Sequence, residues 1–146
     1  MRNKIQEKQF DEERTLYNLK NTDVVGCVFA GPADGESALK ESRDILVQNC
    51  SFSLRYPLWH VEKFEMDKSV MDELTRAAIW YAKEGMITDS TLSGIKAVRE
   101  CKDITLKRCV VNSQEFGWKS KGIRLEDTEI ISEYLLLDSK DVHLPM

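Results

Sequence analysis

The three tryptophans of this 146-residue chain, Trp59, Trp80 and Trp118, are the residues whose type and spacing most clearly suggest binding chemistry. The interval from Trp80 to Trp118 is close to twice the interval from Trp59 to Trp80. Flat aromatic rings beside hydrogen-bond donors suit sugars, whose C–H faces lie on rings and whose hydroxyls take hydrogen bonds. The candidate ligand-binding residues are Trp59, His60, Trp80, Tyr81, Arg99 and Trp118. The expected ligand is a carbohydrate or another elongated molecule.

The spacing of the tryptophans comes from an internal repeat. The segments ALKESRDILVQNC (Ala38–Cys50) and AVRECKDITLKRC (Ala97–Cys109) align without a gap. Six copies recur at a nearly constant interval, and each has a small residue as its anchor. The anchors are Cys27, Cys50, Ser69, Ser90, Cys109 and Thr128. The positions three before and two after each anchor are apolar in every copy, and a fixed period of roughly 20 residues is typical of a solenoid.

Within each copy the apolar residues alternate with polar ones, as in Ile45-x-Val47, which is the period-two pattern of strands. The one weak helical candidate, Asp72–Ala82, is interpreted as a loop entering a strand, because its apolar residues fit the repeat. The predicted fold is therefore all-β, a right-handed parallel β-helix of about six coils with roughly 19–23 residues per coil. Residues 1–14 are predicted to be an N-terminal cap, and residues 15–146 the coils. Equivalent residues of successive coils should then stack in ladders about 4.8 Å apart.

The last coil is predicted to be open. Residues 135–144 match the columns of residues 38–47, but the chain ends before the anchor of that coil. An open coil exposes unpaired strand edges. The favoured explanation is that the chain is a piece of a longer β-helix. The alternatives are an end-to-end homo-oligomer, or a C-terminal segment that folds back as a cap. At the other end, Asn3–Phe10 is expected to cap the first coil through Ile5 and Phe10.

The composition of the chain limits the classes of partner that we expect it to bind. A net charge of −4 and a pI near 5.3 give no electrostatic reason to bind nucleic acid or an anionic membrane. No apolar run approaches the length of a membrane helix, and the first residues have no signal-peptide core, so the expected location is the cytoplasm. We expect no cofactor.

The four cysteines, Cys27, Cys50, Cys101 and Cys109, form no C-x-x-C pair, and the two histidines are far apart in the sequence. We therefore expect no metal site, and we expect reduced, buried thiols. Three of these cysteines share the anchor column with serine and threonine. This pattern predicts a tight bend that admits only small side chains.

Several short motifs accompany the repeat: GESALKES (35–42), PLWH (57–60), IWYA (79–82), GIKAVREC (94–101) and EFGW (115–118). Together they make the chain resemble an uncharacterised bacterial family of unknown function, which is itself similar to the pectin-lyase superfamily of right-handed β-helices. The resemblance covers nearly the whole chain. It implies a β-helix fold and a chain that is the N-terminal half of a longer protein. It implies no established activity and no catalytic residues.

Enzymatic activity on polysaccharides would need clustered carboxylates on one exposed sheet. The best acidic column, six positions before the anchor, contains Asp44, Glu84 and Asp103 but is interrupted by Lys63 and Gly122. It is expected at a bend, where exposed acids are common. We predict no catalytic residue and expect a non-catalytic domain. The alternatives are a carbohydrate-active enzyme whose site needs further coils, and a protein-interaction scaffold.

The tryptophan row should face outward, because it lies next to the aliphatic row of Leu58, Ile79 and Val98. Three other interpretations stay open at this point. The row could be an aromatic ladder that only stabilises stacked strands. The alternation could reverse near a bend and place the tryptophans in the core. The row could also form a protein interface.

Overall fold

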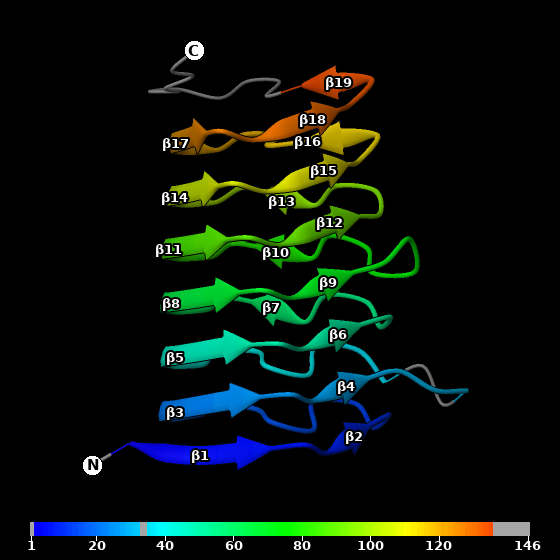
Figure 1. Cartoon of the computed structure of the whole chain (residues 1–146), viewed down its shortest axis with the longest axis vertical. Coiled ribbons are helices and arrows are strands. Elements are labelled where there is room, and N and C mark those ends of the chain that lie inside the picture. The colour runs from blue at the N-terminus through cyan, green and yellow to red at the C-terminus, as the bar shows by residue number, and fades with distance from the viewer. Residues whose placement is uncertain (1, 33–34, 136–146) are drawn as a thin grey trace.

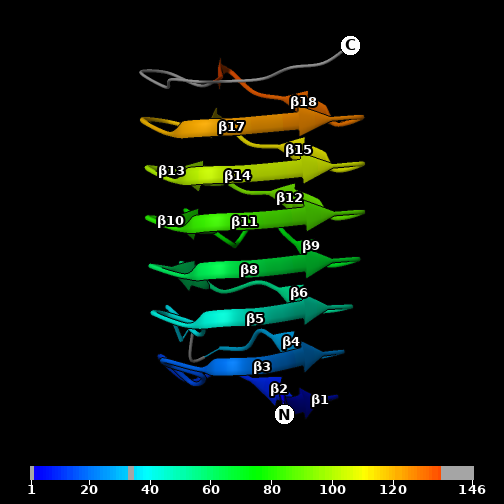
Figure 2. The same cartoon turned by 90° about the vertical axis from the view of Figure 1, so that its left-hand side faces the viewer.

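The computed structural model describes residues 2–32 and 35–135, which form a parallel β-solenoid (Figure 1). The strands at the front of Figure 1 run to the right, those at the back run to the left, and the chain rises from the N-terminus; Figure 2 confirms which strands lie behind. The solenoid is therefore right-handed. No helix occurs among the described residues. The predicted fold class is confirmed, with seven rungs in place of the expected six.

Two seven-stranded sheets form the larger faces. Sheet A contains, in order, β1 (Asn3–Gln6), β3 (Lys20–Val25), β5 (Arg43–Gln48), β8 (Glu62–Asp67), β11 (Lys83–Thr88), β14 (Lys102–Lys107) and β17 (Lys121–Glu126). Sheet B contains β2 (Gln9–Phe10), β4 (Val28–Phe29), β6 (Ser51–Phe52), β9 (Val70–Met71), β12 (Thr91–Ser93), β15 (Val110–Asn112) and β18 (Glu129–Ile131). All neighbouring strands are parallel, because each sheet receives one strand per rung.

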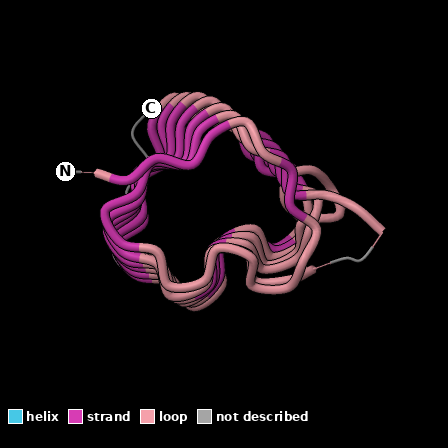
Figure 3. Tube along the Cα trace, turned by 90° about the horizontal axis from the view of Figure 1, so that it is seen from below, coloured by secondary structure: helices cyan, strands magenta, loops and turns pink. Residues whose placement is uncertain are grey.

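The third face is shorter. Sheet C contains β7 (Leu58–Trp59), β10 (Ile79–Trp80) and β13 (Val98–Arg99), and an isolated bridge between Arg99 and Trp118 extends it by one rung. A two-stranded sheet of β16 (Glu115–Phe116) and β19 (Tyr134–Leu135) lies nearest the C-terminal end of the described chain. Seen along the axis, the rungs superimpose (Figure 3) and enclose one hydrophobic core, and the chain that follows β4 projects from the solenoid (Figure 1).

Residues that share a column of the sequence repeat pair with one another on neighbouring strands of the sheets. Ile45 pairs with Phe64, and Val47 with Met66. These side chains are buried, whereas Arg43 on the same strand is exposed. In sheet B, the rings of Phe29 and Phe52 stack with centroids 4.7 Å apart. Each rung therefore fills the same cross-section with the same kind of side chain, which accounts for the duplicated sequence.

The corners of the rungs use residues in the left-handed region. The rung that contains β5 has positive φ at Ser37 (58°), Glu41 (62°), Asp44 (53°) and Asn49 (54°). Equivalent positions in other rungs repeat the pattern, so the acidic column that includes Asp44 does lie at a bend, as expected. A left-handed non-glycine residue is unfavourable by itself. The backbone hydrogen bonds of the rungs on either side hold these corners in place.

The predicted cap at the N-terminus is an additional rung of the solenoid. β1 pairs with β3 and β2 with β4, and the partly buried Ile5 and Phe10 pack against the core. Arg2 fastens this rung to the next two through Asp23 (2.7 Å) and Asp44 (2.8 Å). The predicted open coil at residues 136–146 lies outside the described residues.

The anchor column forms a buried hydrogen-bond ladder. Cys50 donates its backbone N–H to Ser69 Oγ at 3.2 Å, and Ser69 donates its own to Ser90 Oγ at 3.1 Å. Ser69 Oγ donates in turn to the carbonyl of Asp67 at 3.0 Å. Cys27 likewise donates its backbone N–H to the sulfur of Cys50, at 3.4 Å. The anchors are therefore small because space is limited, and Cys50, Ser69, Ser90 and Thr128 each accept a backbone N–H from the rung below.

All four cysteines are buried, free thiols. Burial raises the pKa of Cys50 to about 11 and the pKa of Cys101 to about 12. The segment Asp72–Ala82 forms no helix, in agreement with its interpretation as a loop entering a strand, and Ile79–Trp80 within it is strand β10. No helix of the described chain has the length and apolar character needed to cross a membrane.

Candidate functional site

Sheet C presents the tryptophan row on its outer face. Leu58, Ile79 and Val98 are fully buried, so the residue after each of them points outward. Trp59 pairs with Trp80, and Trp80 pairs with Arg99, in register across the three strands. The tryptophans are half-buried and outside the core. The outward orientation predicted from alternation is therefore what the structure has.

The outward residues form a continuous stack, the aromatic–cation ladder, made of Lys40, Trp59, Trp80, Arg99 and Trp118. The indoles of Trp59 and Trp80 are nearly parallel, at 9°, with centroids 5.1 Å apart. Lys40 Nζ lies 4.2 Å from the Trp59 ring. The Arg99 guanidinium lies 4.7 Å from Trp80 and 4.6 Å from Trp118. Cations suit these places because the faces of aromatic rings are electronegative.

The ladder covers the ring faces of its two central tryptophans. Trp59 lies between Lys40 and Trp80, and Trp80 lies between Trp59 and Arg99. A ligand approaching sheet C therefore meets the edges of these rings. At the end of the ladder, Trp118 is contacted by Arg99 and by Lys119 Nζ, which is 4.7 Å from its ring.

A second stack follows the corner beside the ladder. His60 and Tyr81 lie 5.1 Å apart at 18°, and both adopt positive φ, 57° and 53°. Tyr81 also packs against Trp80, at 5.3 Å. A hydrogen bond with Glu100 in the next rung raises the pKa of Tyr81. The six residues chosen from the sequence are thus brought together on one face of the solenoid.

Besides Lys119 and Glu100, Tyr56 and Lys40 contribute to this face without being among the six. Tyr56 lies 6.3 Å from Trp59 and 5.7 Å from Trp80, with its ring tilted against both. Its copies in the repeat share no chemistry, so the repeat gave no signal for it. Lys40 occupies the same repeat column as the tryptophans, so the sequence does place it beside them, although it was not chosen as a binding residue.

Charges on this face are only partly compensated. Arg99 Nε lies 3.3 Å from Glu100, and Arg55 lies 3.7 Å from Glu36. Within the described part of the chain, neither Lys40 nor Lys119 forms a salt bridge. Across residues 2–32 and 35–135, no group of three or more His, Cys, Asp or Glu side chains is arranged to hold a metal ion.

Two shallow grooves cross the outer face of sheet A, with volumes of about 610 and 500 Å³, and both are lined by Leu46, Glu65 and Met86. Several of the carboxylates that line these grooves are engaged by neighbours. Asp67 accepts hydrogen bonds from Gln48 (3.3 Å) and Thr88 (2.8 Å).

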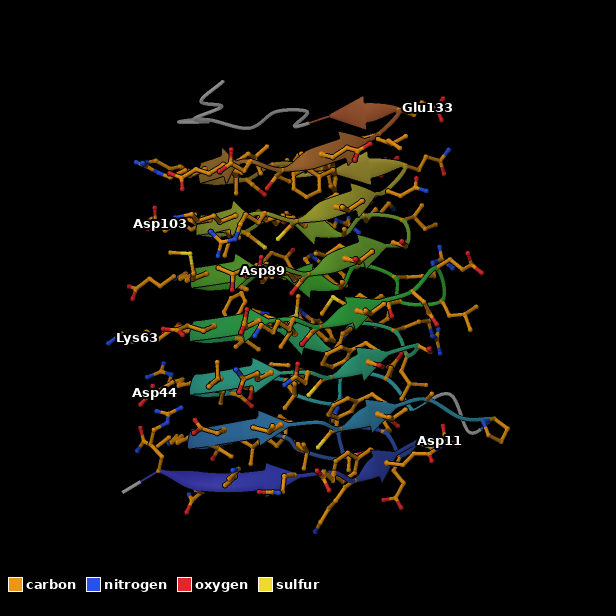
Figure 4. The ribbon with its side chains drawn as sticks, in the orientation of Figure 1. Asp11, Asp44, Lys63, Asp89, Asp103 and Glu133 are labelled. Carbon is orange, nitrogen blue, oxygen red and sulfur yellow. The ribbon has the colours of Figure 1, made fainter. Side chains whose placement is uncertain are left out.

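Asp89, which lines the second groove, is paired as well. Arg108 donates to both oxygens of Asp89, and this pairing lowers the pKa of Asp89. The corner column of Asp44, Lys63 and Asp103 projects from one edge of the sheet (Figure 4).

Comparison with known proteins places the chain in a family and assigns no activity. No curated protein matches it. A trypsin-treated variant of QnrB1, a plasmid-mediated fluoroquinolone resistance protein, matches over 99% of this chain and 92% of its own, with 10% identity and a TM-score of 0.37. A glycosyl hydrolase described as putative, from Parabacteroides merdae ATCC 43184, matches over 88% and 60%, with 10% identity and a TM-score of 0.20.

Neither of these two likenesses is close enough to transfer a function. The family comparison rests on the sequence itself, because one family model matches residues 3–145. That family is described as a protein of unknown function, DUF3737, and the chain belongs to it.

Proposed function

We propose that this protein is a protein-interaction module and that the outer face of sheet C is its contact surface. The face gathers tryptophan, tyrosine and arginine side chains, the types most enriched among residues that dominate binding energy at protein interfaces. Stacking within the ladder already restrains Trp59, Trp80 and Arg99. Little side-chain entropy is then lost when a partner binds.

The observation that carries the proposal is the covered ring faces. A sugar binds an aromatic side chain by laying its C–H face on the ring, and both faces of Trp59 and Trp80 are occupied by ladder neighbours. The carbohydrate ligand expected from the sequence therefore has no free platform on these two rings. Exposed ring edges suit the edge-to-face contacts and carbonyl groups of a protein partner.

The test compares two single substitutions, at residues of similar exposure on different faces of the solenoid. Tyr81 on the sheet C face is 38% exposed, and Met86 on sheet A is 42% exposed. Tyr81→Glu and Met86→Glu each place one carboxylate on the surface. Immobilised wild-type and variant proteins are incubated with an extract of the source cells, and the captured proteins are quantified by mass spectrometry. Circular dichroism melting confirms that both variants are folded.

The proposal expects at least one captured protein that is retained by Met86→Glu and lost by Tyr81→Glu. Capture that is insensitive to Tyr81→Glu would overturn it. A glycan array and a tryptophan-fluorescence titration with oligosaccharides are run in parallel. A saturable fluorescence change with a sugar, abolished by Tyr81→Glu, would replace the proposal with carbohydrate binding.

A further inference from the structure

The outer face of sheet B, whose strands follow one another upward in Figure 1, carries little charge. Its first outward column pairs in register and contains Val28, Ser51, Val70, Thr91, Val110 and Glu129. The second outward column contains Ala30, Ser53, Asp72, Ser93, Asn112 and Ile131. The outward columns of sheet A, by contrast, contain the charged residues Asp23, Glu65, Asp67, Lys107, Arg124 and Glu126. The three valines of sheet B are 40–47% exposed, so this face leaves apolar surface open to water.

The two acids on the sheet B face do not interrupt its apolar stretch. Asp72 is engaged within its own chain, because it accepts hydrogen bonds from Ser53 Oγ and from the backbone N–H of Leu74, the latter at 2.9 Å. Glu129 belongs to β18, at the end of the face. The stretch from β4 to β15 is therefore suited to another flat, uncharged sheet face, because two such faces pack closely without burying unpaired charge.

The sizes of the outward side chains fit a second copy of the same face. Along the first column valine alternates with the smaller serine or threonine, rung by rung. A two-fold axis that is perpendicular to the solenoid axis and passes between β9 and β12 presents this column in reverse order. Val70 then faces Thr91 of the second copy, and Val110 faces Ser51. Copies with parallel axes would place valine on valine and serine on serine, which leaves gaps between the sheets.

The charges along one border of the face fit the antiparallel arrangement. The corner between sheets A and B contains Gly26, Asn49, Lys68, Asp89, Arg108 and Asp127, one residue per rung. In the antiparallel pair Lys68 faces Asp89 of the second copy, and Arg108 faces Asn49. Asp127 faces Gly26. No like charges meet along this border, and Asp89 keeps its contact with Arg108 of its own chain at 2.8 Å.

The remaining charges also meet uncharged residues. Asp72 faces Ser93 of the second copy. In the column that follows the face, Glu73 is the one charged residue of the six described rungs, and it faces Gly94. Glu129 lies at the end of the contact, where its carboxylate stays in water.

The contact has the size of a weak but specific dimer. Six rungs about 4.8 Å apart, and columns that span about 13 Å, give each copy a contact area of roughly 400–500 Å². The total of roughly 1,000 Å² is close to the lower limit for a specific interface. The expected dissociation constant is on the order of 10–100 μM.

We infer that the outer face of sheet B binds the same face of a second copy, with the two solenoid axes antiparallel. The resulting dimer buries the valines of both copies between two sheets. The inference is independent of the proposed function, which concerns sheet C, and both sheet C faces of the dimer stay free for a partner.

The first test measures self-association by sedimentation velocity, over a concentration series from about 1 μM to about 1 mM. Val70→Lys/Val110→Lys is compared with Leu46→Lys/Met86→Lys, which makes the same charge change at outward residues two rungs apart on sheet A. We expect the sheet B variant to weaken dimerisation at least about tenfold, and the sheet A variant less than about twofold. Circular dichroism melting confirms that both variants are folded.

The second test examines the arrangement with a bismaleimide cross-linker that spans about 10 Å, the separation of packed sheets. Ser51→Cys and Val110→Cys should cross-link to each other when the two proteins are mixed. Neither should cross-link to itself, because its two copies lie three rungs, or about 14 Å, apart along the axis. The native thiols are buried and do not compete for the reagent.

A protein that stays monomeric throughout the concentration series would overturn the inference, and so would equal weakening by the two lysine variants. Cross-linking of Ser51→Cys to itself would show parallel copies and would also overturn it. If the protein is monomeric and a captured protein is lost with Val70→Lys/Val110→Lys, a different partner covers this face and the second copy is wrong.

Discussion

A buried pair of residues in sheet A offers the sharpest test of the packing. Gly85 on β11 pairs with Phe64 on β8, and both are buried. A Cβ atom added at Gly85 would lie 2.3 Å from Phe64 Cζ and 2.4 Å from Cε1. Carbon atoms in good contact are about 3.5–4.0 Å apart, so the ring tip would have to move by more than about 1 Å. The phenyl ring of Phe64 therefore fills the space that a side chain at position 85 would need.

The expected free energies follow from that overlap. Forcing an extra methyl group into a packed core costs about 1–3 kcal/mol. Replacing glycine with alanine by itself stabilises the folded state by about 0.4–1 kcal/mol, because the unfolded chain loses conformational freedom. Gly85→Ala should then lower the free energy of unfolding by about 1–2 kcal/mol. Phe64→Leu removes the clashing ring atoms, and in that background Gly85→Ala should stabilise the protein by about 0.4–1 kcal/mol.

The assay is a double-mutant cycle by urea denaturation, followed by circular dichroism. The coupling between the two substitutions should be about 2 kcal/mol, which is large for neighbouring residues. Phe52→Leu is the matched control, because Phe52 is equally buried but belongs to the sheet B stack. Its cycle with Gly85→Ala should be additive. If Gly85→Ala destabilises the wild-type and Phe64→Leu proteins equally, the reasoning about this pair is refuted.

Three further predictions concern the ladders and the thiols. Ser69→Ala leaves the buried N–H of Cys50 without its acceptor and should cost about 1–3 kcal/mol in urea denaturation. Ser69→Cys should cost less, because cysteine fills this position in other rungs; an equal loss would contradict the anchor ladder. Arg99→Ala removes two cation–π contacts and should cost about 1–2 kcal/mol in the same assay, whereas Arg99→Trp should continue the ring stack and recover part of that loss. Burial raises the pKa of Cys50 to about 11 and of Cys101 to about 12, so these two thiols stay protonated at neutral pH. Because only the thiolate reacts, their modification by a disulfide reagent should accelerate as pH rises toward those values or on unfolding, and rapid labelling of both at pH 7 would refute their burial.

The fold could be predicted because a solenoid repeats its constraints. Each coil must place apolar residues at the same points of one cross-section, so columns such as that of Val47 and Met66 are visible in the sequence. The first rung is harder to recognise, although Ile5 and Phe10 fall in the correct columns, one repeat before their partners Val24 and Phe29. Its anchor position holds the large and charged Lys8, so the column pattern by itself indicates a cap there.

Part of the candidate site could also be predicted from the sequence, and part could not. The sequence by itself determined which residues share a column and that this column points outward, because alternation along a strand is a local property of the backbone. Which groups cover the faces of the tryptophan rings is not a local property of the backbone. Lys40, Trp59, Trp80 and Arg99 belong to four different rungs, and their contacts depend on the spacing and register of those rungs. Only the stacked structure could therefore show that the central tryptophans offer edges to a partner, or that Phe64 fills the space beside Gly85.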